Sequence, residues 1–422
     1  MATKQGSTSR NARDNGAPPK VALALAGGGP LGAMYEIGVL MALDESIDGL
    51  DLNGMDVYVG VSAGSFITAA LANGITPSEI YRLFIENEAV DGAKLKPELF
   101  LKPAFKEYFR RAKSLPGLVA EGIYRFATKP FSRGPVDAFA GLSRAIPTGI
   151  FDNEAISRFL NRTFSLPGRT NDFRKLKARL YSVATDLDTG QSVSFGGPGF
   201  DHVPISKAVQ ASAALPGLFP PVRIEGHYYV DGALKKTLHA SVALEDGAEM
   251  VICINPLVPF DADSARRRGK PDMEKLVEGG LPVVLSQTFR AIIHSRMQIG
   301  LSKYDTKYKG ADVVLFEPNS DDPEMFFTNL FSYSTRQRVC EHAYQRTRHD
   351  LLKRRFELAP IFARYGMTLN VDVLKDETRT LDAKVQRSRP RKTRSDRLRG
   401  AMLDLSDAVV ELQGLIARRK AS

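Results

Sequence analysis

Two glycine-rich segments carry residues that could perform chemistry. In the first, residues 60–64 read Gly-Val-Ser-Ala-Gly, so that Ser62 lies between Gly60 and Gly64. The segment follows a β-branched run and precedes a helical pattern, and a serine on such a strand-to-helix turn projects its hydroxyl above the sheet. The following helix would place its positive end near developing negative charge. This context predicts a nucleophile at Ser62; the alternative is an ordinary helix N-cap serine.

The other segment follows the apolar run 21–26 and contains Gly27, Gly28, Gly29 and Gly32. Its spacing satisfies G-x-G-x-x-G, the fingerprint of dinucleotide-binding sites. The same glycines could instead form a turn whose backbone amides hold something smaller than a pyrophosphate. The spacing alone leaves both interpretations open.

The positions of acidic residues separate these two interpretations. A dinucleotide site needs an acidic residue at the end of the second strand, about 20 residues on, to bind the ribose. Here the second strand runs into Ser62, whereas Asp44 and Glu45 come too early. We therefore favour an oxyanion hole in which the amides of Gly28 and Gly29 face a tetrahedral intermediate. One such donor contributes about 3–4 kcal/mol to transition-state stabilisation.

A serine nucleophile requires a base. None of the six histidines lies in a glycine-framed loop, and His239 is expected to be a surface or capping residue. Asp231 follows the strand pattern HYYV and precedes Gly232, so its carboxylate is expected to project from a strand end. An aspartate in this position is often an ordinary turn residue. Position alone therefore makes Asp231 a candidate base and leaves the turn role open.

Strand-like runs alternate with helical patterns along the chain. Besides residues 21–26, they occur at 56–60, 180–186, 227–231, 250–256 and 313–318. This alternation predicts an α/β domain with a central, mostly parallel sheet flanked by helices.

The remaining segments depart from this alternation. Residues 1–19 are polar and expected to be disordered, 20–350 to form the catalytic domain, and 351–383 a helical extension. Within the domain, residues 91–150 form a helical insertion that interleaves aromatic residues with Lys and Arg. Such an insertion could lie on an anionic membrane surface, or it could be a helical cap whose aromatic residues pack inward.

The formal net charge of +10 is concentrated in a basic tail, residues 384–422. We expect a solvated segment there; membrane contact is a lesser alternative and nucleic-acid binding is unlikely. The same tail predicts an amphipathic helix over 398–416, which could form a homo-oligomer or lie on a surface. Its heptad positions are Leu398, Met402, Leu405, Val409, Leu412 and Ile416.

Composition narrows the class of protein. Apolar residues make up 43% and charged residues 25% of the 422 residues, as in soluble globular proteins. Cys253 and Cys340 form neither a disulfide framework nor a metal-ligand spacing, and we predict no metal and no cofactor. No run approaches the roughly 18–20 apolar residues of a membrane span, and none reads as a signal peptide. We expect a cytoplasmic protein, peripheral to a membrane at most.

Five segments, in this order, resemble the patatin-like phospholipases: LALAGGGPLGAMYEIGVL, GVSAG, SVATDLDTG, AVQASAALPGLFPPV and YVDGAL. The resemblance covers about residues 20–350. It implies a three-layer α/β/α fold and a lipid acyl hydrolase with a Ser–Asp dyad and no histidine. Carried over, Ser62 is the nucleophile and Asp231 the base, and the glycine-rich oxyanion motif consists of Gly27, Gly28, Gly29 and Gly32.

One position departs from the family's pattern. In the family's glycine-rich motif, the residue before the last glycine is usually Arg or Lys, whereas here Leu31 precedes Gly32. The departure weakens the case for phospholipids, so a phospholipase A or lysophospholipase has a rival in a neutral-lipid esterase or acyltransferase. A non-catalytic lipid scaffold is the alternative from another class. Asp186 and Asp188 are expected to be strand-end and turn residues.

Overall fold

The computed structural model describes residues 18–90, 95, 102–128, 145–268, 276–302, 304–325, 333–389, 402 and 409. Its centre is a sheet with the order β6-β7-β4-β3-β1-β8-β9, and β5 pairs with β4. The strands are β1 (Val21–Leu25), β3 (Val57–Val61), β4 (Arg179–Asp186), β5 (Ser192–Phe195), β6 (Val222–Ile224), β7 (His227–Asp231), β8 (Met250–Ile254) and β9 (Asp312–Phe316). A separate pair joins β2 (Ile47–Asp48) to β10 (Thr368–Leu369).

The sheet is mixed and mostly parallel, as the sequence predicted. β1 pairs in parallel with β3 and β8, β3 with β4, and β8 with β9. β5 and β7 pair with β4 in antiparallel register, and β6 does so with β7. All the strands expected from the sequence are present, with ends that differ by two residues or less. The strands that were not expected, β2, β5, β6 and β10, are too short to show a periodic pattern.

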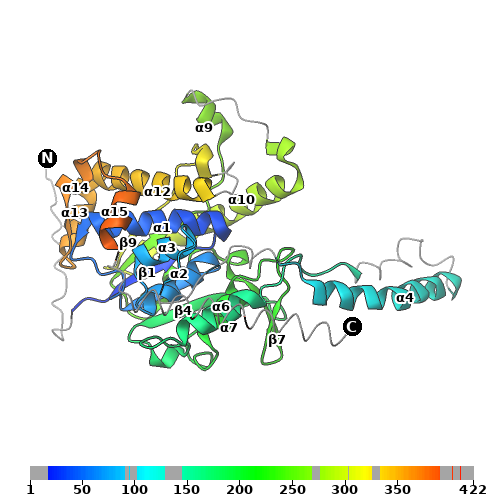
Figure 1. Cartoon of the computed structure of the whole chain (residues 1–422). Helices are drawn as coiled ribbons and strands as arrows, with labels where there is room; N and C mark the ends of the chain where they lie inside the picture. Colours follow the sequence, from blue (N-terminus) through cyan, green and yellow to red (C-terminus); the bar gives the residue numbers. More distant parts are fainter. Residues whose placement is uncertain are drawn as a thin grey trace.

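Helices cover both faces of the sheet (Figure 1). Alternation along β1 sends Leu23 and Leu25 into one core and Ala22 and Ala24 into the other, because successive strand residues point to opposite faces. The larger core is built with α1 (Gly29–Ser46), α2 (Ala63–Ala72), α3 (Pro77–Phe84), α7 (Ile205–Ser212) and α12 (Tyr333–Lys353). The smaller core is built with α8 (Ala240–Glu245) and α10 (Gly280–Ser302). The fold is therefore the predicted three-layer α/β/α arrangement.

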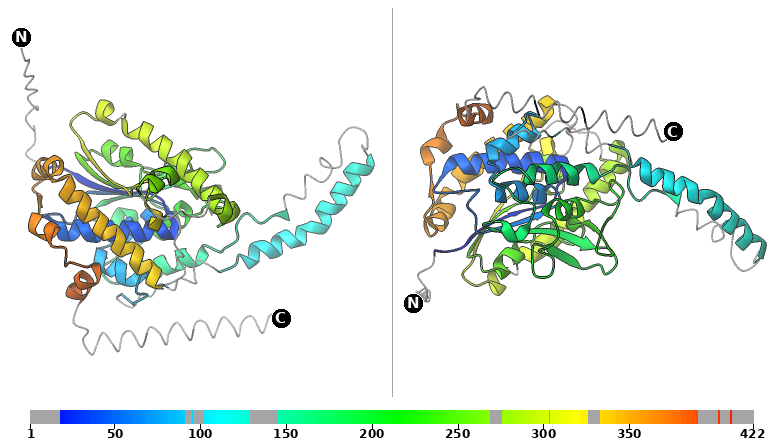
Figure 2. Two further views of the ribbon diagram at one scale, coloured as in Figure 1. Left: turned by 90° about the horizontal axis from the view of Figure 1, so that it is seen from above. Right: turned by 60° about the horizontal axis from the view of Figure 1, so that its bottom comes forward.

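Within the described part of the predicted insertion, the helix is α4 (Phe105–Thr128), which extends away from the body in every view (Figures 1 and 2). Residues 91–94, 96–101 and 129–144 of the insertion lie outside the described residues. The remaining helices are α6 (Glu154–Phe164), α9 (Ala262–Arg267), α11 (Tyr304–Lys307), α13 (Arg355–Ala363), α14 (Val371–Lys375) and α15 (Leu381–Ser388). Among the residues that the structure describes, no helix is both long enough and apolar enough to cross a bilayer.

The first residues of the basic tail are folded, which corrects the expectation that the tail is solvated from residue 384 onward. α15 lies against the end of α1, where Lys384 Nζ is 2.6 Å from Asp44 Oδ2 and Arg387 Nη2 is 3.0 Å from Glu45 Oε1. Carboxylates at the end of α1 attract this basic stretch. Of the heptad positions, the structure describes Met402 and Val409, and both are exposed. The rest of that predicted helix and residues 1–17 lie outside the described residues.

A helix-to-helix contact between α1 and α12 depends on Gly38. A β-carbon built on Gly38 would lie 2.4 Å from the Cys340 carbonyl oxygen and 2.7 Å from Ala343 Cβ. We predict that Gly38→Ala lowers the free energy of unfolding by about 1–3 kcal/mol, because overpacking outweighs the roughly 1 kcal/mol by which helix propensity favours alanine. Urea unfolding measures the change.

Gly300→Ala in α10 is the matched control, because a β-carbon there meets only Lys236 Cε, at 3.9 Å. This substitution should leave stability unchanged or raise it. If both substitutions stabilise the protein equally, α1 and α12 do not pack as closely at Gly38 as the structure indicates.

Candidate active site

Ser62 lies on a sharp turn between β3 and α2. Its backbone angles are φ 52° and ψ −119°, a region that non-glycine residues rarely occupy. Two glycines make the turn possible: a β-carbon would lie 2.4 Å from Ser65 Cα if built on Gly60, and 2.6 Å from the Ala26 carbonyl oxygen if built on Gly64. The G-x-S-x-G pattern therefore forms a strained strand-to-helix elbow.

The Ser62 hydroxyl is not used as a helix cap. Ser62 occupies the N-cap position of α2, but its side chain forms no capping hydrogen bond. Instead, the side chain lies near the Asp231 carboxylate, close enough to lower the pKa of that group. The Ser62 hydroxyl is therefore not used by the helix end.

The register of the sheet brings Ser62 and Asp231 to the same level. Val61 pairs with Val183, so Ser62 continues β3 to the level of Ala184, and Ala184 pairs with Asp231. Because β4 lies between β3 and β7, the two backbones are about 10 Å apart. Gly232 allows the chain after Asp231 to run close to β4, because a β-carbon there would lie 2.3 Å from the Val183 carbonyl oxygen.

The Asp231 carboxyl is buried, with 2% of its surface exposed. Desolvation raises its pKa to about 6, although hydrogen bonds from Ser62 and from the Ala233 amide act in the opposite direction. The Ala233 amide lies 2.8 Å from Asp231 Oδ1 and fixes the carboxylate. A carboxyl group with this pKa is ionised at neutral pH yet is a stronger base than an exposed aspartate.

The glycine segment forms the start of α1 beside Ser62. Gly28 is the N-cap and Gly29 the first helical residue, with a φ of +59°. A β-carbon on Gly27 would lie 3.1 Å from Ser62 Cβ, which shows how closely this loop approaches the serine. Because first-turn amides have no partner within a helix, those of Gly28 and Gly29 can face a ligand. The positive ends of α1 and α2 thus meet near the Ser62 hydroxyl.

Gly32 has a different part in this loop. Its amide donates to the Gly28 carbonyl, with 3.0 Å between nitrogen and oxygen, and therefore belongs to the helix. A β-carbon on Gly32 would lie 2.9 Å from Pro256 Cγ, so its lack of a side chain allows the segment after β8 to approach α1. Within the predicted oxyanion set, Gly32 acts through packing and not as a donor.

Ser212, the last residue of α7, contacts the elbow although no sequence pattern singled it out. Its hydroxyl accepts the Ser62 amide hydrogen at 2.8 Å and donates to the Val183 carbonyl at 2.6 Å. The side chain is fully buried, so these bonds connect the elbow to β4 in an apolar environment. The only sequence signal is a serine among alanines in Ala-Ser-Ala-Ala, which does not reveal its partners.

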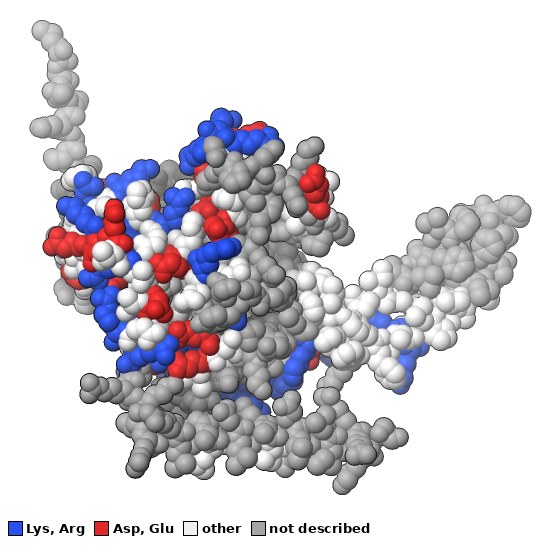
Figure 3. All heavy atoms as spheres, turned by 45° about the horizontal axis from the view of Figure 1, so that its top comes forward, with Lys and Arg blue, Asp and Glu red and all other residues white. Residues whose placement is uncertain are grey.

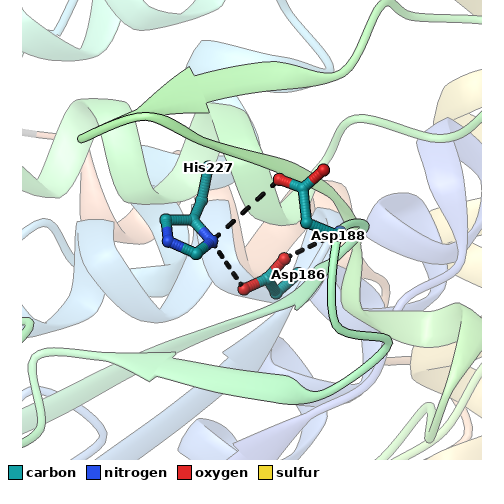
Figure 4. A group of neighbouring side chains, drawn as sticks. All are labelled: Asp186, Asp188 and His227. Atoms are coloured by element: carbon teal, nitrogen blue, oxygen red, sulfur yellow. Dashed lines mark hydrogen bonds and ion pairs between the residues drawn. The ribbon is translucent and has the colours of Figure 1, made fainter.

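Asp186, Asp188 and His227 lie close together where β4 ends and β7 begins (Figure 4). The His227 Nδ1 atom is 3.2 Å from Asp186 Oδ2 and 4.0 Å from Asp188 Oδ2, and together the three residues could offer three ligand atoms to a metal. The carboxylates already accept backbone amides, from Asp188 to Asp186 and from Tyr228 to Asp188. As the sequence predicted, both aspartates are strand-end and turn residues, and they connect β4 to β7.

His239 corrects one expectation. It occupies the N-cap position of α8 but is buried, and its side chain forms no capping bond. Burial, together with the charge of Lys236, lowers its pKa to about 3, so the ring is neutral. His239 is therefore neither a surface residue nor a capping side chain.

Comparison with known proteins places these residues in one family. The family model described as patatin-like phospholipase matches residues 23–244, more than half of the chain. A protein of Acanthamoeba polyphaga mimivirus, named as uncharacterised, is 28% identical over 240 residues, which cover 55% of this chain and 66% of that protein. The chain thus spans just under two thirds of that relative's length.

Solved structures with related folds are more distant. VipD from Legionella pneumophila is 14% identical with a TM-score of 0.36, over 79% of this chain and 66% of that one. The type III effector ExoU of Pseudomonas aeruginosa is 16% identical with a TM-score of 0.36, over 96% and 66%. Human GIVD cytosolic phospholipase A2 is 17% identical with a TM-score of 0.26, over 60% and 44%.

The bonds of Ser212 generate a prediction about the elbow. Ser212→Ala should leave the Ser62 amide and the Val183 carbonyl buried without this partner, which costs about 1–3 kcal/mol of stability. We also expect at least a tenfold slower reaction of Ser62 with a fluorophosphonate probe, because the elbow loses a fixed point. Urea unfolding and labelling kinetics measure the two effects.

Ser206→Ala is the control, since Ser206 is also a buried serine of α7 but bonds to Asn171. It should lose stability without slowing the labelling. Equal labelling rates in both variants would refute a positioning role for Ser212.

Proposed function

The chain belongs to the patatin-like phospholipase family, and from this premise we propose that it is a serine lipid acyl hydrolase of the phospholipase A or lysophospholipase type. The observation that carries the proposal is the placement of the buried Asp231 carboxylate near the Ser62 side chain, at the same level of the sheet. The first-turn amides of α1, beside the serine, supply donors for an oxyanion.

In the proposed mechanism, Asp231 accepts the Ser62 proton as Ser62 Oγ attacks the ester carbonyl carbon of a lipid. The carbonyl oxygen becomes an oxyanion that the amides of Gly28 and Gly29 stabilise. The tetrahedral intermediate collapses, the proton passes from Asp231 to the leaving alcohol or lysolipid, and the acyl group remains on Ser62. Asp231 then deprotonates water, which attacks the acyl carbonyl; as the bond to Ser62 Oγ breaks, Asp231 returns the proton to Oγ and the fatty acid is released.

Burial compensates for the absence of histidine in this mechanism. An exposed aspartate with a pKa near 3.8 is a weak base, whereas the pKa of Asp231 is about 6. A base works best when its pKa lies near the working pH and it remains ionised there. Asp231 meets both conditions at neutral pH.

Leu31 favours a second substrate class. It is buried in the apolar core, so the loop lacks the cation that family members usually carry at this position. An uncharged loop does not select an anionic head group, and neutral-lipid ester hydrolysis or acyl transfer is therefore the alternative. Release of fatty acid from phospholipid, lysophospholipid and glyceride, measured side by side, ranks the substrates; acyl transfer requires an added alcohol acceptor.

The dyad can be tested by substitution. We predict that Ser62→Ala and Asp231→Asn each lower kcat/KM for a soluble p-nitrophenyl ester by about 10⁴-fold or more, because the two residues act as a unit. Asp188→Asn is the matched carboxylate control, because Asp188 is half-exposed and bonds to a backbone amide. It should keep most of the activity. Full activity in Ser62→Ala would refute the nucleophile, and a wild type inactive on every ester would favour a lipid scaffold.

The pH profile tests the base independently. Since Asp231 must be ionised to accept a proton, kcat/KM should rise with pH and level off above a pKa of about 6. The profile of the Asp188→Asn control should have the same limb. If kcat/KM instead rises and levels off below pH 5, the base is not a buried carboxyl group with a raised pKa.

The raised pKa of Asp231 should also affect the free energy of unfolding. The ionised form favours catalysis but lowers stability. Because burial raises the folded-state pKa, the ionised Asp231 destabilises the native state, and this penalty grows as pH rises from about 4 to 6. Asp231→Asn removes the charge, so its stability relative to wild type should increase by about 1 kcal/mol from pH 5 to pH 8. Urea unfolding at both values measures it, and a difference that does not vary with pH would argue against the raised pKa.

A further inference from the structure

The helix α10 exposes an apolar stripe that does not take part in the core. Its buried face includes Ile293 and Met297, and Met297 belongs to the smaller core against the sheet. Leu285, Phe289 and Ile292 follow one another at spacings of four and three, so they share a different face. Their side chains are 44%, 44% and 47% exposed. Packing α10 on the sheet therefore accounts for only part of its apolar surface.

A second apolar surface begins in the loop before β6 and continues onto α4. It consists of Leu218, Ile150, Phe105 and Phe109, with exposed fractions that rise from 41% through 50% to 71% and 64%. Figures 1 and 2 show that α4 projects beyond the body, and Phe105 and Phe109 lie in its first turns. Large aromatic side chains are therefore presented to the solvent.

This second surface is tied directly to the segment that holds Asp231. The Ala104 amide donates to the Ile150 carbonyl, and the Ile150 amide donates to the Gly217 carbonyl. The loop that contains Gly217 also contains Ala214, whose carbonyl accepts the Asp231 amide at 3.0 Å. The base of α4 is thus connected to the dyad through a short series of backbone bonds.

The α10 surface has a similar connection. Lys236, which follows the Asp231 strand, donates to the Tyr304 hydroxyl at 2.7 Å, and Tyr304 begins the helix after α10. At the other end, Gln287 forms two hydrogen bonds with the backbone of Phe260, in the segment after β8. Both apolar surfaces are therefore hydrogen-bonded to segments that lie next to strands of the central sheet.

The two helices themselves carry more positive than negative charge. α10 contains no Asp or Glu and its Arg296 is exposed, although the exposed Glu278 lies in the turn just before it. In α4, Lys and Arg outnumber Glu, and Glu107 is paired with Arg111 at 2.9 Å. In Figure 3, the described part of α4 is largely uncharged, with a group of Lys and Arg along one edge. Apolar side chains next to positive charge are typical of helices that lie in the interface of an anionic membrane.

We propose that α10 and α4 form a docking rim that binds the surface of an anionic lipid aggregate and brings Ser62 to its substrate. The docking rim comprises Leu285, Phe289 and Ile292 of α10 with Leu218, Ile150, Phe105 and Phe109. The inference rests on the proposed function and names the surface on which it operates. A lipid surface fits better than a second copy of this chain, because two positively charged rims repel each other whereas anionic head groups attract them.

The test measures vesicle binding without hydrolysis. Full-length protein with Ser62→Ala is co-sedimented with phosphatidylcholine vesicles that contain or lack phosphatidylglycerol. Phe289→Ser with Ile292→Ser alters α10, and Phe105→Ser with Phe109→Ser alters α4. Phe356→Ser is the matched control, because Phe356 is 79% exposed but lies on α13. Each double variant should bind anionic vesicles at least tenfold more weakly, and the control should bind like the parent.

The same double substitutions in active protein separate this proposal from the proposed function. Hydrolysis of the soluble ester should remain within twofold of wild type, while hydrolysis of vesicle phospholipid falls at least tenfold. Unchanged vesicle binding in both double variants would overturn the docking rim, even if the esterase is active. A loss of binding in Phe356→Ser equal to theirs would also overturn it. So would a wild-type dimer that the double substitutions convert to monomers without affecting vesicle binding.

Discussion

The strained backbone of Ser62 is the constraint on which the candidate site depends. Holding a serine at φ 52° and ψ −119° costs on the order of 1–3 kcal/mol, and the surroundings must supply this energy. They do so through the close approach that Gly60 and Gly64 allow and through the Ser212 bond to the Ser62 amide. Relaxation of the turn would remove the hydroxyl from Asp231 and from the start of α1 together.

Two opposing electrostatic environments meet at this turn. The starts of α1 and α2 favour negative charge next to the serine, whereas burial disfavours the charge on Asp231. An arrangement of this kind suits a reaction in which negative charge moves from the carboxylate to a new oxyanion. The low-dielectric interior makes both effects larger than they would be in water.

The sequence predicts the parts of this molecule that depend on local pattern. The strands, the elbow at Ser62 and the glycine start of α1 follow from periodicity and from residues that only certain turns accept. The pairing of Asp231 with Ala184 brings Asp231 to the level of Ser62. This pairing depends on the order of the strands in the sheet, which the local sequence pattern does not encode. Ser212 and His239 were missed or misjudged for the same reason: their environments come from distant elements.

The order of the sheet limits how this chain can be divided. β1 carries the glycine segment and lies between β3 and β8, yet β8 and β9 come after residue 244, where the family match ends. A fragment that stopped there would turn β1 from an interior strand into an unprotected edge, with backbone groups open to pairing with other chains. The boundary of sequence similarity is therefore not a boundary at which this protein can be cut.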